Sequence, residues 1–307
     1  MGTRSRGGSR TRRRRRARGR EAFIPRGIAP AVYAVGIDLA WSPRNPSGLA
    51  IAERSRGRWI LSDVLAGLRS NEEIVGWMER GIGARPAIAA IDAPLVVPYE
   101  RRGREGDRLV TRLFGPMEAG VYPATRRGLR RYGGDRIWSL VHALEAHGYR
   151  HDCRIVPRRK TRQVFETYPH AAMVALFGLR RTLKYKTRQG RTYATRWRAL
   201  RALEAHLRSL ETLEPGLIGV DEVFEPDARL RGGKLKDYED RLDAIVCAYV
   251  AAYYWTWGTR RCAIMGTLEG GYIVTPMTPA IADRAPDGSP VFAYDGDRSV
   301  RPGRRAP

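Results

Sequence analysis

The sequence predicts an α/β fold in which one mixed sheet is flanked by helices. Apolar strand-like runs and helical repeats follow one another as strand, strand, strand, helix, strand, and then a mostly helical middle. The chain has 307 residues, 43% of them hydrophobic, which is enough for one large core. Because no polar linker interrupts the middle, we expect one domain rather than two.

Three strands are expected first. The apolar run 31–38 closes in Asp38 and is typical of a buried strand. Residues 47–53 and 58–64, separated by a short polar turn, favour a hairpin after it.

A capping box then opens the first helix. Ser70 is followed three residues later by Glu73, so each side chain can satisfy a free backbone N–H group of the other. The helix is expected to run to about Arg80. The apolar run 87–91 after it predicts another buried strand, which ends at Asp92.

The middle of the chain is expected to be mostly helical. Segments 107–114 and 135–147 carry helical repeats. The stretch 163–167 is strand-like and contains Glu166 shortly before Pro169. Glu166 is either a functional acid at a strand end or part of the cap region of a helix with Pro169 at its first position, and the sequence favours neither interpretation.

The last part of the chain predicts a long helix and a hairpin. The helix is expected over 237–257, and the hairpin strands over 262–265 and 272–274. After Pro276 the composition turns to Pro, Asp, Gly and Arg, so residues 277–307 are expected to form a tail.

Four acids suggest a metal site. Asp240 and Asp243 lie together near the start of the long helix, where like charges repel, so either a cation compensates them or solvent near the helix N-terminus does. Asp38 and Asp92 end two buried strands, and open sheets bind ligands beyond the carboxyl ends of their strands. All four can therefore meet in an all-oxygen site for a hard cation such as magnesium.

These motifs resemble those of a known family. Gly36-Ile37-Asp38-Leu39-Ala40, Ile91-Asp92-Ala93-Pro94-Leu95, Phe165-Glu166-Thr167-Tyr168-Pro169 and the Asp240/Asp243 helix are similar to the successive motifs of the domain of unknown function 429 family, predicted nucleases with a ribonuclease-H-like fold. The resemblance runs from about Tyr33 to about Pro276. It implies a nuclease domain over 31–276, with a mixed five-stranded sheet, a helical insertion and a C-terminal hairpin.

The resemblance also implies a set of site residues. In that superfamily, acids on the first strand, the fourth strand and a late helix hold two divalent metals for phosphodiester hydrolysis. Carried over, this implies Asp38 and Asp92 as strand ligands, Asp240 and Asp243 as helix ligands, and Glu166 as a further catalytic acid. The cofactor is expected to be Mg²⁺ or Mn²⁺.

Charge points to nucleic acid as the partner. The net charge is +24, and it remains +14 when the ten arginines of residues 1–20 are left out. Residues 1–30 are expected to be a disordered arm, either phosphate-binding or merely solvated.

A second basic stretch lies in the insertion, about 180–225, which is expected to contain a helix over 192–210. Its first part carries nine Lys or Arg, no acid, and the aromatics Tyr185, Tyr193 and Trp197. It is either a solvated helix face with core aromatics or a single-strand interface, and the nearby acids favour the interface. The expected contacts are Lys184, Lys186, Arg188, Arg191 and Arg196.

Other classes of protein lack support. The three cysteines have no Cys-x-x-Cys spacing, which argues against structural zinc and a disulfide framework. No stretch has the length of a membrane span and no signal-peptide core follows the arginines, so a cytoplasmic location without membrane contact is expected. No obligate protein partner is inferred. Phosphate-binding glycine loops and a Gly-x-Ser-x-Gly elbow are absent, which disfavours a phosphotransferase and a serine hydrolase.

We therefore predict a divalent-metal-dependent nuclease that hydrolyses phosphodiester bonds of DNA or RNA. Lys184 and Lys186 could also neutralise transition-state charge if the insertion folds back over the acids. The alternative is a non-catalytic nucleic-acid-binding protein on the same fold, in which the acids are structural.

Overall fold

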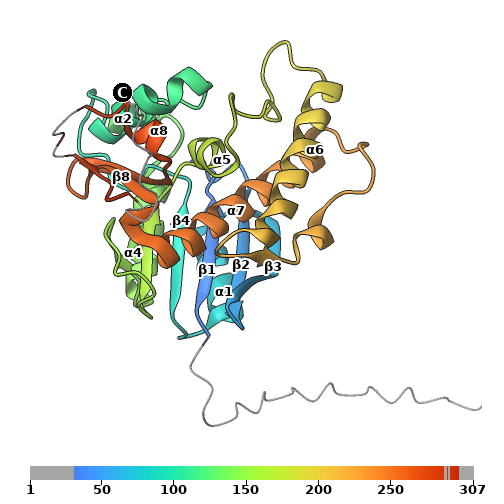
Figure 1. The fold of residues 1–307 in the computed structure, drawn as a ribbon, viewed down its shortest axis with the longest axis horizontal. Helices are drawn as coiled ribbons and strands as arrows, with labels where there is room; N and C mark the ends of the chain where they lie inside the picture. Colours follow the sequence, from blue (N-terminus) through green and yellow to red (C-terminus); the bar gives the residue numbers. More distant parts are fainter. Residues whose placement is uncertain (1–30, 287–288, 290, 297–307) are drawn as a thin grey trace, which may run out of the picture. The chain divides into compact units, whose positions relative to one another are not determined.

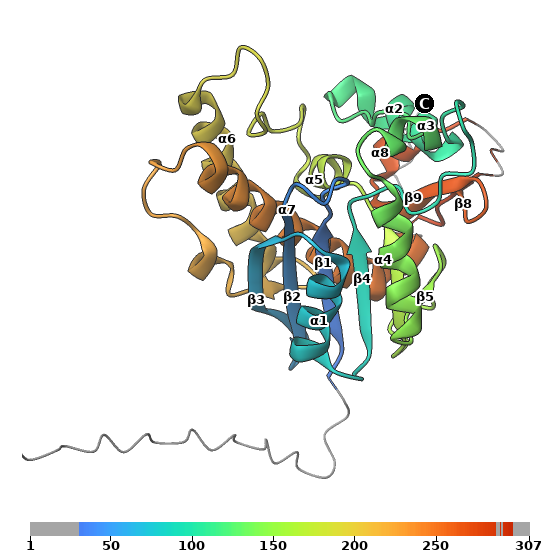
Figure 2. The same ribbon diagram turned by 180° about the vertical axis from the view of Figure 1, so that it is seen from behind.

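The computed structural model describes residues 31–286, 289 and 291–296. The predicted arm over 1–30 and the end of the predicted tail, 297–307, lie outside the described residues. Figure 1 shows one main sheet, with the helices labelled α5, α6 and α7 on the side that faces the viewer. Figure 2 shows α1 and α4 on the opposite side.

The main sheet has seven strands in the described chain. In sheet order they are β5 (Arg150–His151), β6 (Arg162–Glu166), β4 (Ala87–Ile91), β1 (Tyr33–Asp38), β2 (Ser47–Ser55), β3 (Arg58–Leu68) and β7 (Leu217–Ile218). Only β2 runs antiparallel to its neighbours. The mixed five-stranded sheet predicted from the sequence is present as β3-β2-β1-β4-β6, an arrangement consistent with the ribonuclease-H-like fold.

The two additional strands, β5 and β7, extend the edges of this sheet. Each pairs through only two residues with its neighbour. A two-residue strand is too short to show an alternating pattern, so neither strand could be predicted from the sequence.

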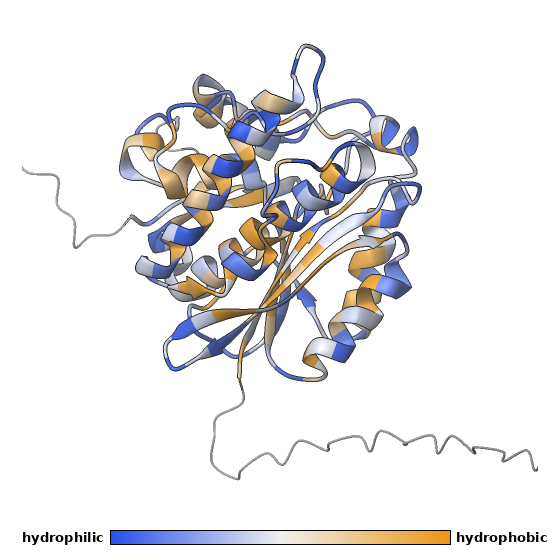
Figure 3. Cartoon of the chain, turned by 90° about the vertical axis from the view of Figure 1, so that its right-hand side faces the viewer, coloured by the Kyte–Doolittle hydropathy of each residue, from blue (hydrophilic) through white to orange (hydrophobic). Residues whose placement is uncertain are grey.

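Helices cover both faces of the sheet. The long helix α7 (Gly232–Trp257) packs on one face, together with α5 (Pro169–Phe177) and α6 (Tyr193–Ser209). The other face is covered by α1 (Asn71–Ile82) and α4 (Asp135–Ala146). Figure 3 shows the hydrophobic residues gathered on the strands and on the helix surfaces that face them. The sheet therefore separates two apolar layers.

A smaller antiparallel sheet lies beside the main one. Its strands, in order, are β10 (Phe292–Ala293), β8 (Cys262–Thr267) and β9 (Gly271–Pro276), and α2 (Glu105–Phe114) packs against β8 and β9. The remaining helices are α3 (Arg126–Arg130) and α8 (Pro279–Ala282), with short 3-10 segments at Gly115–Met117, Leu210–Thr212, Val220–Val223 and Gly258–Arg260. The predicted C-terminal hairpin is thus β8–β9.

Local sequence signals agree with the elements they predicted. The Ser70 side chain accepts a hydrogen bond from the Glu73 backbone, and the Glu73 carboxylate accepts one from the Ser70 backbone, which completes the capping box. The stretch around Glu166 contains both a strand end and a helix start, because β6 ends at Glu166 and Pro169 is the first residue of α5.

The expectation of a plain tail after Pro276 needs correction. Residues 279–282 form α8, and β10 pairs with β8 through Met265 and Ile264. Ile281 is buried, and Phe292 packs against the same apolar cluster as α2. These few apolar residues are enough to dock the segment, although the Pro, Asp, Gly and Arg around them hid the elements.

Among the described residues, no helix combines the length and apolar character needed to cross a membrane.

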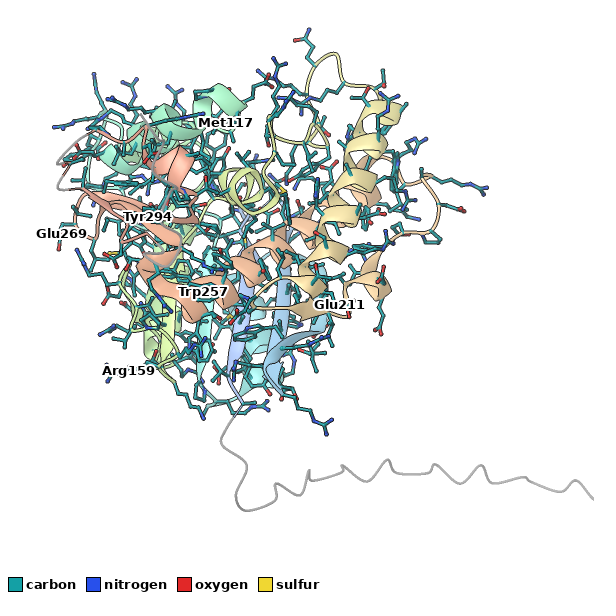
Figure 4. The ribbon with its side chains drawn as sticks, viewed as in Figure 1. Met117, Arg159, Glu211, Trp257, Glu269 and Tyr294 are labelled. Atoms are coloured by element: carbon teal, nitrogen blue, oxygen red, sulfur yellow. The ribbon has the colours of Figure 1, made fainter. Side chains whose placement is uncertain are left out.

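Figure 4 shows side chains ending in nitrogen around the outline of the chain, and Trp257, the last residue of α7, is labelled there.

Candidate metal centre

Three of the predicted acids come together in the fold. Asp38 is the last residue of β1, and Asp240 and Asp243 lie one turn apart on α7. One carboxylate oxygen from each lies within 4.8 Å of the others. Asp240 and Asp243 are almost completely buried, and the Asp38 side chain is 15% exposed.

Two glycines allow α7 to approach the strands this closely. A β-carbon at Gly36 on β1 would collide with the backbone of Ala244, and one at Gly48 on β2 would collide with the backbone of Asp240. Only glycine leaves room for helix backbone to rest directly on strand backbone. The glycines therefore set the separation of Asp38 from the helix acids.

The cation that compensates the acids is Lys186. The insertion folds back so that its ammonium nitrogen pairs with Asp243 and lies 3.6 Å from Asp38 Oδ2 and 3.7 Å from Asp240 Oδ1. Lys236, one turn before Asp240 on α7, pairs with Asp240 as well. Of the two explanations for the helix acids, compensation by a cation is the one the structure shows.

Tyr185 adds a neutral contact from the same segment. Its hydroxyl is buried and donates a hydrogen bond of 2.5 Å to Asp243 Oδ1. This donor fixes one oxygen of Asp243 while Lys186 pairs with the other.

Two oxygens of the cluster are left without a hydrogen bond. Asp38 Oδ2 and Asp240 Oδ2 are buried, and neither finds a donor among the described residues. Asp38 Oδ2 keeps only the Lys186 ammonium at 3.6 Å, so both oxygens have lost water without gaining a hydrogen bond, which is costly for a buried carboxylate. Both oxygens suit a hard cation such as Mg²⁺ or Mn²⁺, which takes oxygen ligands. The donor set thus fits the predicted metal.

Burial and mutual repulsion separate the proton affinities of these acids. Burial would raise the pKa of Asp38, but the charges of Lys186 and Lys236 outweigh it and hold the pKa below its ordinary value. Burial and the Asp38 charge raise the pKa of Asp240 to about 7, against the opposing effect of the lysines. Burial would lower the pKa of Lys186, yet the surrounding acids raise it well above its usual range.

Asp92 lies on the open side of the cluster. Its backbone N–H donates to Ile37 O at the end of β1. Asp92 and Asp38 line a common cavity of about 200 Å³. The pKa of Asp92 is raised well above its ordinary value, mainly by burial and to a lesser extent by the charges of Asp38 and Asp243. Its carboxylate is outside the three-acid group but faces the same space.

Glu166 lines the same cavity in a different role. Its two oxygens accept hydrogen bonds of 2.7 Å each from the Arg104 guanidinium, and Oε2 also accepts from Leu95 N at 2.8 Å. Arg104 is buried and pairs with Asp107 on α2 as well. Burial would lower the pKa of Arg104, but Glu166 and Asp107 raise it, so the guanidinium stays charged. Burial raises the pKa of Glu166 to about 7, against the opposing effect of Arg104.

The predicted nucleic-acid contacts of the insertion have diverse surroundings. Lys184 pairs with Glu118, and Arg196 is buried against Glu239. Arg191 donates to Lys186 O, and Arg188 is exposed. Only part of the set therefore faces solvent, and Lys186 serves the acid cluster.

The predicted base-stacking aromatics of the insertion are mostly core residues. Tyr185 and Trp197 are 0% and 4% exposed, and Tyr193 is 41% exposed. The stacking interpretation is therefore wrong for Tyr185 and Trp197. Trp197 and Leu200 begin a stripe of buried residues on α6, and that helical spacing was the signal that favoured a core role.

Several residues that lie at the site were not predicted from the sequence. Lys236 is spaced i, i+4 from Asp240, so helix geometry could have found it. Tyr185 and Arg104 offer no such signal, because their partners Asp243 and Glu166 are far away in the sequence.

The fold and the acid cluster together define the class: an α/β protein with buried carboxylates at the carboxyl end of a central strand. Residues 36–265 match the model of a family described as a protein of unknown function, DUF429. This match spans most of the chain and includes every acid discussed above, so the chain belongs to the DUF429 family. No curated protein and no solved structure matches the chain.

Proposed function

We propose that this protein is a divalent-metal-dependent nuclease. The observation that carries the proposal is the pair of buried oxygens on Asp38 and Asp240 that accept no hydrogen bond, within a group of three carboxylates at the end of β1. A site built only from oxygen ligands suits Mg²⁺ or Mn²⁺, the ions that serve phosphodiester chemistry in such sites.

The residues have distinct roles in this proposal. Asp38, Asp240 and Asp243 would hold the metal, and Asp92 would extend the ligand set on the cavity side. When bound, the metal would supply polarisation of water and of the scissile phosphate. Lys186 lies among the carboxylates and opposes their mutual repulsion, and Tyr185 orients Asp243.

Glu166 is better placed for positioning than for chemistry. Both of its oxygens are engaged by Arg104, which ties β6 to α2 behind the cavity. In the proposed reaction Glu166 therefore fixes the wall of the cavity and leaves metal binding to the aspartates.

The charge of the chain supports nucleic acid as the substrate. A net charge of +24 favours a polyanionic partner through counterion release. Arg188 on the insertion is exposed and remains a proposed phosphate contact. The three cysteines are buried and unpaired, which suits the reducing cytoplasm that we propose as the location.

The direct test is cleavage of a nucleic-acid panel. Purified protein is incubated with single- and double-stranded DNA and RNA, each with Mg²⁺, with Mn²⁺ and with a chelator. We expect cleavage that needs one of the metals. Binding without cleavage in every condition would instead establish the alternative, a non-catalytic nucleic-acid-binding protein.

A further inference from the structure

We propose that an aromatic cavity beside the acid cluster is a stacking subsite for the unpaired bases of a single-stranded nucleic acid. The rings concerned belong to Trp41, Tyr122 and Tyr132. This inference rests on the proposed nuclease function and adds to it the place where the strand lies.

The cavity adjoins the acids directly. It has a volume of about 480 Å³, and its lining includes all three rings. Trp41, Tyr122 and Ala124 also line the smaller cavity that contains Asp38 and Asp92. A base held against these rings would therefore lie beside the cavity that Asp38 and Asp92 line.

Two of the three rings are presented to solvent, and the third, Trp41, packs partly against the core. Tyr122 is 84% exposed and Tyr132 is 58% exposed. Trp41 is half-buried and meets Tyr132 edge to face, with ring centroids 6.4 Å apart and planes at 71°. Neighbouring exposed rings around a cavity are a typical binding surface for flat apolar groups.

Hydrogen bonds fix the segment that carries Tyr122. The Thr111 hydroxyl donates to Val121 O at 3.1 Å and accepts from Val121 N at 3.2 Å. Ala124 N donates to Asp107 Oδ2 at 2.8 Å, and Asp107 is itself held by Arg104. Tyr122 is thus exposed on backbone that is anchored on both sides, so little order has to be gained on binding.

The segment that carries Trp41 is fixed in a similar way. Arg136, a buried residue of α4, donates to Ala40 O at 2.8 Å and to the Ser47 hydroxyl at 3.3 Å. Ala40 N donates to the same hydroxyl at 3.1 Å. The buried guanidinium therefore holds both ends of the turn that contains Trp41.

Charge around the cavity favours a polyanion over a neutral aromatic ligand. Residues 121–134, which supply most of the lining, contain four arginines and no acid. Arg127 and Arg131 in this segment are exposed, as is Arg44 on the Trp41 turn. Rings interleaved with cations suit a strand whose bases are unpaired, because base pairing would hide the faces that stack.

The test compares strands with and without bases. The full-length Asp38→Asn protein, in the presence of a chelator, is titrated with a labelled oligonucleotide and with an abasic strand of equal length and charge. Deoxyribose and ribose versions of the base-containing strand show which sugar the subsite takes. We expect the protein to prefer the strand with bases, because only that strand can stack on the rings. The Arg-rich residues 1–20 should interact with both strands alike and so add nothing to the preference.

Tyr122→Ala is the decisive variant. It should weaken affinity for the base-containing strand by about tenfold or more and leave affinity for the abasic strand unchanged. Tyr122→Trp should retain the preference, because it keeps an aromatic face. Tyr99→Ala is the matched control, since Tyr99 is also partly exposed but lies outside both cavities. Tyr193→Ala on α6 tests the rival site, because Tyr193 is the exposed aromatic of the predicted interface on the insertion.

The possible failures are distinguishable. If the parent prefers bases but Tyr122→Ala behaves like it, or if Tyr193→Ala alone loses the preference, the subsite inference is overturned and the proposed nuclease stands. Equal affinity for both strands overturns stacking in the same way. If the protein binds no nucleic acid at all, the inference and the proposed function fall together.

Discussion

The ammonium nitrogen of Lys186 lies 3.6 Å from Oδ2 of Asp38, although one residue belongs to the insertion and the other ends the first strand. The same ammonium group reaches Asp240 and Asp243 on α7. Lys186 therefore holds a cationic position among the carboxylates of the proposed metal site, where it would compete with the metal.

Replacement of Lys186 by Met should have opposite effects on the free and the metal-bound protein. The free protein should lose about 1–3 kcal/mol of unfolding free energy, because buried acids lose their counter-charge. Metal affinity should rise by about tenfold or more, since a repelling charge is gone. Urea denaturation and the metal-induced rise in Tm measure the two effects.

The control for this variant is Lys184→Met. Lys184 pairs with the partly exposed Glu118, so its loss should change stability by no more than about 0.5 kcal/mol. A smaller metal-induced rise in Tm for Lys186→Met than for the parent would show that Lys186 assists the metal and does not compete with it.

Asp38→Asn should abolish metal-dependent cleavage. The substitution keeps the shape of the side chain and removes a charge from the proposed ligand set. Nucleic-acid affinity should be retained or improved, because repulsion of phosphate is reduced. Cleavage and binding assays on one preparation measure both properties.

Asp63→Asn is the matched control, because Asp63 is an exposed acid on β3 of the same sheet. It should cleave like the parent. Parental cleavage by Asp38→Asn would remove the first-strand acid from the mechanism.

Glu166→Gln should affect folding more than cleavage. The change leaves the buried Arg104 with Asp107 as its remaining acidic partner and should cost about 2–4 kcal/mol of unfolding free energy. Below its melting temperature, the folded variant should still cleave in the presence of metal. A variant as stable as the parent but inactive would instead assign Glu166 the catalytic role implied by the family resemblance.

Metal binding should strengthen as pH rises toward neutrality. The pKa of Asp240 is about 7, because of burial and the Asp38 charge, and a ligand must be ionised to bind metal. Below that pKa, each unit of falling pH should weaken metal affinity by about tenfold, and above it the affinity should no longer depend on pH. The metal-induced rise in Tm, measured between about pH 6 and pH 8, tests this, and an equal rise throughout would contradict it.

The unfolding free energy of the metal-free protein should change with pH in the opposite direction, because of the same carboxyl group. The folded pKa of Asp240 lies above its ordinary value of 3.8, so the folded state binds the proton more tightly than the unfolded chain. The stability that this group contributes is present below about pH 3.8 and is lost as pH rises through about 7. In Asp240→Asn this component should be absent from urea denaturation curves.

Much of the fold was predictable because its signals are local. The Ser70–Glu73 capping box and Pro169 at the start of α5 involve residues a few positions apart. The acids Asp38 and Asp92 follow apolar runs that form the central strands β1 and β4. That they share one cavity follows from parallel pairing, which aligns the carboxyl ends of neighbouring strands.

By itself, the sequence determined the strand and helix order, the apolar layers and the placement of the aspartates at one edge of the sheet. Only the tertiary structure decided that Lys186 folds back onto those acids, that Arg104 engages Glu166, and that Tyr185 is buried while Tyr122 is exposed. The physical reason is the distance along the sequence over which each signal acts. Periodicity and caps depend on neighbours within a few residues, whereas ion pairs and ring exposure depend on which distant segments the packed core brings together.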